Sequence, residues 1–395
     1  MKHKVMKMKI VLLLMVIIVC TIAGCSKDKD DSIEVRGKNY YRSGVADLVE
    51  VSSGFYMIDT SNFIKYYDKE SKQTIVLCNK PECKHNSSEC YGYVNYLRGT
   101  LATDGKYLYF IGMERVINEK VKEMVIEYFL CRVHLDGTVI EKLSTIKTQI
   151  VKGEETVNGL WTSNLYVTEN VAYYLMYSNE EREESGVKLY RINLEKEGKI
   201  TELTFIPCSN EGHGTLTLYG GYNNFLWFQI QRLGEKGFVG DIYYYDIENK
   251  IEEKVMENIQ DARASGMEPI EDGFFYISEG QVWKYNKNTQ EKNVLIQLGD
   301  ESQVYHTPFI YEDKLIVNGM NAIYVYDMEG KLIKKLEMQK ENRVEGSQLD
   351  INLKGIDMDG NMIIYTIGTE ELLATFYQWN LNNALNGTGV EEKIF

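Results

Sequence analysis

Short segments that alternate apolar and polar residues recur along the chain from residue 40 to its end. In a typical unit, a turn with Gly, Asp or Asn opens an aromatic or aliphatic strand, and a second strand follows that closes on Asp or Asn. Residues 312–317 and 322–327 form one such unit. Alternation with period two predicts half-buried strands, and the Asp and Asn residues at the strand ends predict hairpin turns.

The first strand of this unit occurs seven times. Its copies are residues 53–57, 104–110, 169–175, 221–228, 271–277, 312–317 and 359–365. A repeat of about 50 residues is typical of propeller blades, and a single blade cannot bury its apolar faces alone. The pattern therefore predicts an all-β chain folded as one β-propeller domain, with seven blades of mostly four-stranded antiparallel sheets. Because the copies are imperfect, six or eight blades are the alternatives.

The ends of the repeat and its insertions lead to two further expectations. We expect ring closure to place a strand near residues 40–42 beside the final strand at residues 391–395. The charged segments 115–123 and 179–184 are predicted to be loops or hairpin tips. Insertions of this kind project from one face of a repeat protein and often carry binding residues.

The N-terminal segment has the pattern of a targeting signal. Four lysines lie within residues 1–9, and an almost wholly apolar run follows at residues 10–20. This run is short for a transmembrane anchor, which is the alternative. It ends in Ile-Ala-Gly-Cys at residues 22–25, which closely resembles the bacterial lipobox, where cleavage precedes an acylated cysteine. We predict a signal peptide at residues 1–24, lipid attachment at Cys25, a polar tether over residues 25–37 and the propeller over residues 38–395.

Charge and composition narrow the classes of partner. The chain has 58 Asp plus Glu against 44 Lys plus Arg, for a net charge of −14. An acidic chain is a poor ligand for nucleic acid, because phosphate binding needs a basic surface. Anionic lipid would also repel it, so the lipid on Cys25 is expected to hold the protein at the outer face of a bacterial cell membrane. No oligomer is expected.

A cluster of metal-ligand residues is the most specific chemical signal. Cys78, Cys83, His85 and Cys90 lie within 13 residues, spaced C-x4-C-x-H-x4-C. Three thiolates and an imidazole make a closed tetrahedral set for a structural zinc ion. The alternatives are a disulfide in a secreted protein, with at least one of the five cysteines beyond Cys25 unpaired, or free thiols. Either a metal ion or a disulfide would hold a long loop in place rather than catalyse a reaction.

The other chemistry-bearing residues are interpreted as structural, and no catalytic residue is assigned. Isolated residues of this kind are Cys131, Cys208, His134, His306, Trp161, Trp227, Trp283 and Trp379. The cysteines are expected to be buried and the tryptophans to pack between blades. His213 lies in a glycine-containing loop, where a ligand role is the alternative. Residues 357–361 resemble the start of a calcium loop, but position twelve is Gly368 instead of Glu, so a hairpin turn is favoured.

Three segments carry a resemblance to a known family. They are the lipobox at Cys25, residues 77–85 together with Cys90, and the ending Asn-Gly-Thr-Gly at residues 386–389. With these the chain resembles lipid-anchored propeller proteins of Gram-positive anaerobes, whose domain is similar to the β-propeller of low-density-lipoprotein-receptor-related proteins. The resemblance implies the architecture and no established activity. The Tyr-Trp-Thr-Asp signature of the receptor propellers is missing here, so their ligand modes are not carried over.

The sequence thus predicts a membrane-anchored extracellular lipoprotein with a non-enzymatic propeller. Its partner would be a protein, a peptide or a glycan. The chain has no G-x-S-x-G, H-E-x-x-H or P-loop motif. The enzymatic alternative is a hydrolase or lyase acting on cell-wall or dietary polysaccharide, with acidic residues from several blades at the mouth of the axis. A third alternative is a sensor or assembly subunit of a membrane complex.

Overall fold

The computed structural model describes most of the predicted propeller domain. The described residues are 40–42, 47–118, 123–137, 140–152, 160–168, 170–178, 185–195, 198–208, 213–222, 225–235, 237–260, 266–298, 308–319, 322–338, 352–367 and 374–395. All of them belong to one compact unit, Val35–Phe395. The predicted signal peptide, Cys25 and the tether lie outside the described residues. Within the part described, no helix has the length and hydrophobicity needed to cross a membrane.

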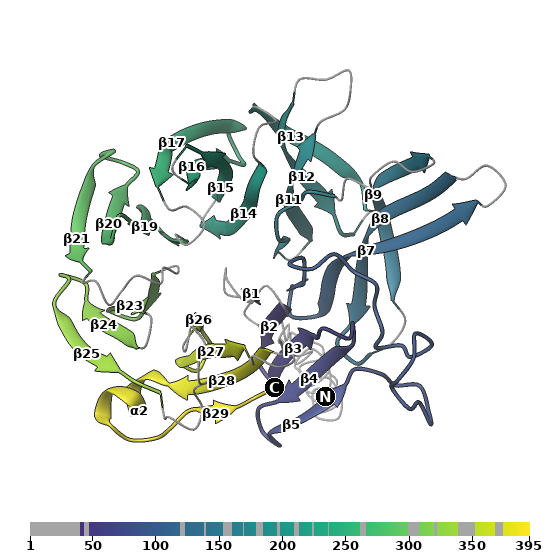
Figure 1. Cartoon of the computed structure of the whole chain (residues 1–395), viewed down its shortest axis with the longest axis horizontal. Helices are drawn as coiled ribbons and strands as arrows, with labels where there is room; N and C mark the ends of the chain where they lie inside the picture. The colour runs from purple at the N-terminus through teal and green to yellow at the C-terminus, as the bar shows by residue number, and fades with distance from the viewer. Residues whose placement is uncertain are drawn as a thin grey trace, which may run out of the picture. The chain divides into compact units, whose positions relative to one another are not determined.

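The described residues form seven antiparallel sheets, in which the strands follow one another in chain order (Figure 1). Blade 1 contains β1 (Tyr40–Arg42), β2 (Asp47–Val51), β3 (Gly54–Ile58), β4 (Ile64–Asp68) and β5 (Gln73–Val76). Blade 2 contains β6 (Ala102–Thr103), β7 (Tyr107–Asn118), β8 (Glu123–His134) and β9 (Glu141–Lys152). Blade 3 contains β10 (Tyr166–Thr168), β11 (Val171–Ser178), β12 (Gly186–Asn193) and β13 (Ile200–Pro207).

The remaining four blades complete the ring. Blade 4 contains β14 (His213–Tyr222), β15 (Phe225–Gly234), β16 (Gly237–Asp246) and β17 (Ile251–Gln260). Blade 5 contains β18 (Met267–Ile270), β19 (Gly273–Ser278), β20 (Gln281–Asn286) and β21 (Lys292–Gln297). Blade 6 contains β22 (Phe309–Tyr311), β23 (Lys314–Asn318), β24 (Ile323–Asp327) and β25 (Leu332–Leu336). Blade 7 contains β26 (Asn352–Ile356), β27 (Asn361–Ile367), β28 (Ala374–Asn380) and β29 (Glu392–Lys393), with the short helix α2 (Leu381–Asn386) before its last strand. The prediction of a seven-bladed, all-β propeller is confirmed.

Burial falls from the inner to the outer strand of a blade, and the residue pattern follows it. Every residue of β2 and β3 is buried, whereas β5 is almost wholly exposed. Blade 5 repeats this gradient from β19 to β21. A strand covered on both faces reads as a continuous apolar run, while a half-covered strand alternates. The aromatic-rich first strand of each sequence repeat is thus a buried strand such as β3 or β19, which has a further strand on its inner side.

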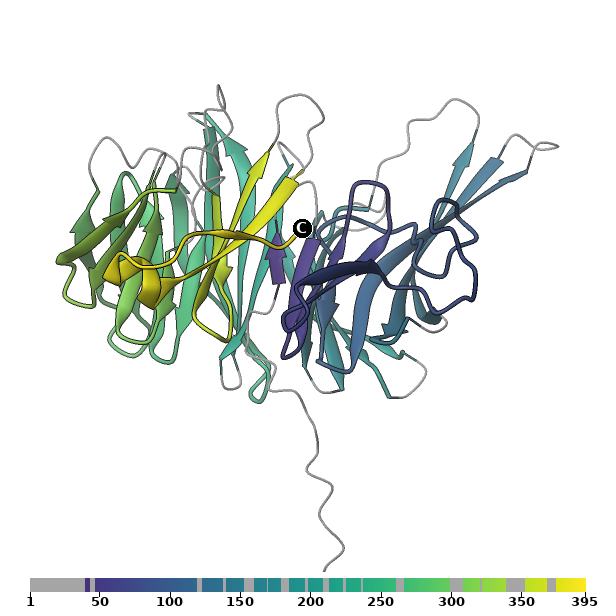
Figure 2. The same ribbon diagram turned by 90° about the horizontal axis from the view of Figure 1, so that it is seen from below.

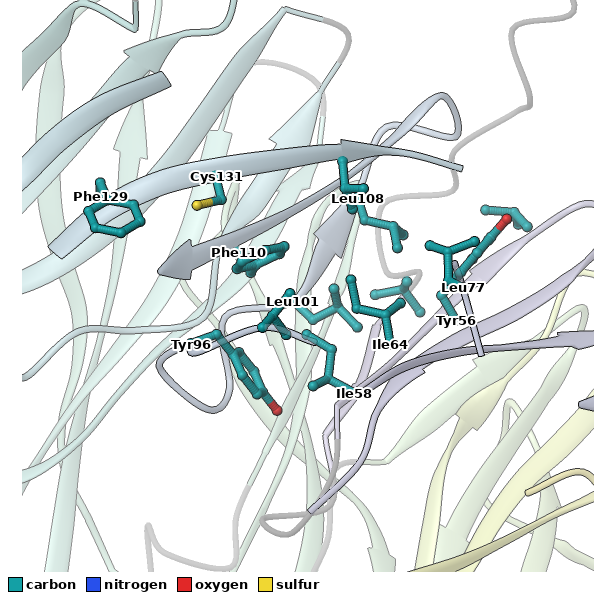
Figure 3. Close-up of a cluster of buried hydrophobic side chains, with 14 residues drawn as sticks. Tyr56, Ile58, Ile64, Leu77, Tyr96, Leu101, Leu108, Phe110, Phe129 and Cys131 are labelled. Atoms are coloured by element: carbon teal, nitrogen blue, oxygen red, sulfur yellow. The ribbon is translucent and has the colours of Figure 1, made fainter. Parts of the chain in front are cut away.

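The hydrophobic core is divided among the seven junctions between neighbouring blades. One cluster joins blades 1 and 2 and includes Ile58, Tyr96 and Phe110 (Figure 3). Five more clusters join blades 2 to 7 in sequence. The seventh joins blade 7 to blade 1 through Phe376 and Phe55. Each blade therefore depends on both neighbours, as expected of a closed ring.

The predicted mode of ring closure is wrong. β1 pairs with β2 in blade 1, and β29 pairs with β28 in blade 7, so the two ends complete separate sheets. Each terminal strand finds a free edge in its own blade, and no exchange between the blades is needed. Side-chain contacts link the two instead: Lys72 forms a 2.8 Å ion pair with Glu392, and the Thr74 hydroxyl donates to the carbonyl of Ile394 at 3.2 Å.

Buried polar side chains also connect the inner strands of neighbouring blades. Asp47 accepts a hydrogen bond at 2.7 Å from a backbone N–H of the segment leading into blade 2. The Asn164 amide donates to the Leu218 carbonyl at 2.6 Å and accepts from its N–H at 3.0 Å. Asn318 accepts from the N–H of Leu353 at 3.0 Å. Such bonds satisfy backbone groups that water does not reach, and they set the register between blades.

Blade 2 differs from the others in the length of its strands. β7, β8 and β9 have 12 residues each, and Figure 2 shows their outer ends projecting beyond the neighbouring blades. Of the two alternatives predicted for residues 115–123, the hairpin tip is the one observed, because Arg115 to Asn118 continue β7 and pair with β8. The rest of that segment, residues 119–122, and the predicted loop at 179–184 lie outside the described residues.

Candidate functional site

The structure brings together the four predicted metal ligands. The thiols of Cys78, Cys83 and Cys90 and a ring nitrogen of His85 all lie within 4.8 Å of one another. His85 Nδ1 lies 3.4 Å from Cys90 Sγ. In a tetrahedral zinc site with metal–sulfur bonds of about 2.3 Å, neighbouring ligand atoms are separated by roughly 3.5–4 Å. The donor set and its spacing therefore fit a structural Zn²⁺ ion with no coordination position open to substrate.

Local turns of the loop between blades 1 and 2 assemble this cluster. The loop leaves β5 at Leu77, whose N–H donates to the carbonyl of Ile64 at 2.8 Å. Glu82 and His85 have left-handed backbone conformations, with φ of 58° and 52°. These turns fold the chain back, so that residues only a few positions apart present their side chains to one point. The predicted proximity is local in origin.

Backbone N–H groups point at two of the sulfur atoms. The N–H of Gly92 lies 3.4 Å from Cys90 Sγ, and the N–H groups of Lys80 and Tyr91 donate to the sulfur of Cys78. Burial raises the pKa of Cys78, but these donors outweigh it and hold the pKa below the ordinary value. Burial and the neighbouring thiols raise the pKa of Cys90 to about 11. A bound cation would favour the thiolate form of both, because it offsets their mutual repulsion.

The cluster is attached to the core between blades 1 and 2. Cys90 is buried, while Cys78 and Cys83 are half-buried and His85 is exposed. Leu77, which precedes the first ligand, belongs to that core, as does Val94, which follows the last (Figure 3 labels Leu77). A metal ion or a disulfide in the cluster would fix the path of the loop between Leu77, where it leaves the core, and Val94, where it rejoins it. The three thiols are also close enough that a disulfide between two of them remains the alternative, as expected from the sequence.

The other predicted residues are scattered over the ring. His134 ends β8, and its Nδ1 lies 3.1 Å from a carboxylate oxygen of Asp136, in keeping with a strand-end role. His213 begins β14, and His306 lies outside the described residues. Cys131 is buried in the core between blades 1 and 2, as predicted. Cys208 is half-buried, so the expectation of full burial is wrong for it.

The tryptophans divide into packing residues and an exposed one. Trp227 and Trp379 are buried in cores between blades, and Trp283 packs against such a core, as predicted. Trp161 is 48% exposed, so the packing interpretation is wrong there. It precedes β10 and is held at the backbone by the N–H of Tyr177, which donates to its carbonyl at 2.9 Å.

A second cluster, of acidic residues, was not predicted. The carboxylates of Glu50, Asp357 and Asp359 lie within 4.8 Å of one another where blade 7 meets blade 1. Residues 357–361 form a turn, as favoured over a calcium loop, in which Asp357 accepts from the N–H groups of Asp359 and Asn361. The amine of Lys69 sits among the three carboxylates and supplies the positive charge. The sequence offers no signal for this contact, because its members come from opposite ends of the chain.

The chain has distant similarity to several solved structures. No family model and no curated protein matches the chain. It is similar to an oligogalacturonate lyase in complex with manganese, at 12% identity and a TM-score of 0.48, over 88% of this chain and 91% of that one. It is also similar to the β-propeller domain of the trilobed protease from Pyrococcus furiosus, at 13% identity and a TM-score of 0.46, over 91% and 97% of the two chains.

A third similar structure is an acylaminoacyl peptidase in complex with Z-Gly-Gly-Phe-chloromethyl ketone. The identity is 13% and the TM-score 0.47, over 91% of this chain and 53% of the peptidase, so the chain spans about half of that protein's length. At these identities the similarity concerns the fold and carries no inference about activity.

Proposed function

We propose that this protein is a lipid-anchored, non-enzymatic binding module at the outer face of a bacterial membrane, and that it binds a protein partner. The anchor is the lipid expected on Cys25, with residues 25–37 as the tether. The partner surface is the projecting part of β7, β8 and β9, which we call the blade 2 arm. Its exposed apolar row is the observation that carries the proposal.

The row crosses all three strands of the arm. Val116 on β7 lies opposite Val125 on β8, which lies opposite Ile150 on β9, so the three side chains share one face. Val116 is 61% exposed and Ile150 is 56% exposed. Scattered apolar residues on a surface are ordinary, but a contiguous row on a projecting sheet favours contact with another protein.

The border of this row indicates the chemistry of the partner. One step toward the ring on the same face, Glu114 lies opposite Glu127 and forms an exposed ion pair with Lys142. A partner with an apolar patch flanked by Lys or Arg would complement this surface. The contact between apolar groups would provide most of the affinity, and the charges would chiefly set the association rate and the orientation.

The enzymatic alternative finds less support. Two buried carboxylates on the inner strand β2 are Asp47 and Glu50. Asp47 bonds to the segment leading into blade 2, and Glu50 bonds to Lys69 and to the N–H of Met358 in blade 7. Both thus connect blades, which is a structural use that leaves little freedom for acid–base chemistry at the axis.

Site-specific photo-cross-linking in intact cells tests the partner surface. A photoreactive residue at Val116 should give a discrete cross-linked product, and the Ile150→Glu substitution should remove it without unfolding the ring. The matched control is Leu332, which is 48% exposed on the outer strand of blade 6. The same products from both positions, or none from Val116, would contradict the proposal.

The anchor is tested separately. The Cys25→Ser variant should leave the membrane fraction and lose the mass of the acyl chains. This result does not depend on the blade 2 arm. If the unaltered protein is lipid-anchored but Val116 gives no cross-link, only the proposed partner surface is overturned.

A further inference from the structure

A pocket of about 220 Å³ lies between blades 3 and 4. Blade 3 and the segments on either side of it contribute aromatic and thiol groups, and blade 4 contributes charged ones. The residues that matter for its chemistry are Trp161, Tyr177, Cys208, Arg232, Asp241 and Lys254. None of them belongs to the metal-ligand cluster or to the blade 2 arm.

The charged wall of the pocket has a fixed geometry. Arg232 on β15 donates to the Asp241 carboxylate at 2.8 Å and also bonds to the Asn258 side chain. Asp241 is buried and accepts a second bond, at 2.8 Å, from the Asn258 N–H. The pairing of β16 with β17 shifts register here, and Asn258 has a φ of 55°. This irregularity in the sheet brings the Asn258 N–H to Asp241, which in turn orients the guanidinium.

The wall is cationic within an acidic protein. Arg232 and Lys254 contribute two positive charges and Asp241 one negative charge. Lys254 also forms a 3.2 Å ion pair with Glu257, but both side chains are substantially exposed, so that water competes with this pair. Because Arg232 is already paired with Asp241, Lys254 is the cation that an anionic ligand would meet in this pocket.

The residues that blade 3 and the segment before it contribute to the pocket are aromatic and partly exposed. Trp161 is 48% exposed, in contrast to the buried Trp227, and Tyr177 beside it is half-buried. An indole face suits the C–H face of a ring, and the Lys254 ammonium suits a carboxylate. The ligand that uses both groups is a small ring that carries a carboxylate and has further polar groups.

We propose that this pocket binds one acidic sugar unit, a pyranose ring with a carboxylate. A single pyranose ring is small enough to enter a space of about 220 Å³. A sugar is favoured over the aromatic end of a peptide because the lining is polar as well as apolar. The site goes beyond the partner surface proposed above and is independent of it.

Cys208 provides a built-in reporter of occupancy. Its thiol lies in the wall and is half-buried, and Tyr177 is its hydrogen-bond partner. A bound ring would therefore shield it from iodoacetamide, and peptide mass spectrometry would give its alkylation rate. Cys131, which is 2% exposed, should stay unmodified as long as the ring is folded.

The experiment compares glucuronate with glucose, which differs from it by the carboxylate alone, on protein purified from cells in detergent. Glucuronate should slow Cys208 alkylation saturably, at concentrations at least about tenfold lower than glucose requires, because a charge-assisted bond supplies 1.4 kcal/mol or more. The Trp161→Ala substitution should abolish the protection. Lys254→Gln should raise the glucuronate concentration needed for protection toward the concentration that glucose needs. The control Lys284→Gln in blade 5 should leave both concentrations unchanged.

Three outcomes would overturn the proposal. One is equal protection by glucose and glucuronate, and another is no saturable protection by either sugar. The third is stronger protection by N-acetylphenylalanine, which would assign the pocket to the end of a peptide. The two sugars are compared on the unaltered protein, so the test stands even where a variant fails to fold.

Discussion

Lys69 and Asp359 are 290 residues apart in the chain, and their side chains meet at 2.6 Å where blade 1 contacts blade 7. The same amine lies 2.8 Å from Glu50 and 3.6 Å from Asp357. Burial alone lowers the pKa of Lys69, but its bonds to Asp359 and Glu50 raise it above the ordinary value. One cation thus lies among three carboxylates at the junction that closes the ring.

Removal of this cation should weaken ring closure. The Lys69→Met variant is expected to lose about 3–5 kcal/mol of unfolding free energy, because Glu50 and Asp357 are buried and would lack a counter-charge. Urea denaturation measures the loss. Lys72→Met is the control, since Lys72 also pairs with blade 7 but is exposed, and its loss should have little effect. Equal losses in the two variants would show that the buried cluster has no special role.

The same cluster predicts a pH dependence. Burial raises the pKa of Glu50, and the neighbouring Asp357 raises it further. Glu50 therefore keeps its proton in the folded state at pH values where it has lost the proton in the unfolded chain. The unfolding free energy falls as the pH rises from 4.5 through the raised pKa. The Glu50→Gln variant cannot lose this proton. Its stability relative to the unaltered protein should rise over that pH window, and a constant difference across denaturation curves would contradict the assignment.

The metal-ligand cluster predicts a mass change on unfolding. Protein purified anaerobically should show a native mass that exceeds the denatured mass by one zinc ion, because the folded loop brings the ligands together. Cys83→Ser should lose the ion and unfold at a lower temperature, whereas Cys208→Ser, outside the cluster, should keep it. A denatured mass lighter by two hydrogens, with no metal, would instead assign a disulfide.

The bond between blades 3 and 4 predicts a further loss of stability. Asn164→Leu keeps the side-chain size but removes both hydrogen bonds to Leu218, at an expected cost of about 1–3 kcal/mol for each backbone group left unsatisfied. The control is Asn95→Leu, since Asn95 is exposed and donates to the Met113 carbonyl, which water can solvate. Thermal unfolding of the two variants gives the comparison, and equal melting temperatures would refute the prediction.

Local patterns in the sequence were sufficient to predict the strands and the metal-ligand cluster. Alternation and turn residues located the strands, and the sevenfold repeat predicted the ring, because each blade is built from consecutive residues. The four metal-ligand residues lie within 13 positions, so turns within one loop are enough to place them near one another in sequence order. The helix α2 was not foreseen. It spans only six residues, capped by Asn380 and Gly387, too few for a helical period to emerge.

Tertiary structure alone decided which blades meet and what their junctions contain. The end strands complete their own sheets, and Lys69 gathers carboxylates from blade 7. Trp161 and Arg232 come to line one pocket, although they belong to different sheets. Hydrophobic patterning specifies that a face is buried but not which surface covers it, so contacts between distant blades leave no local trace. The sequence by itself thus determined the strands, the repeat and the metal-ligand cluster, while the closing contact and the pocket depend on the closed ring.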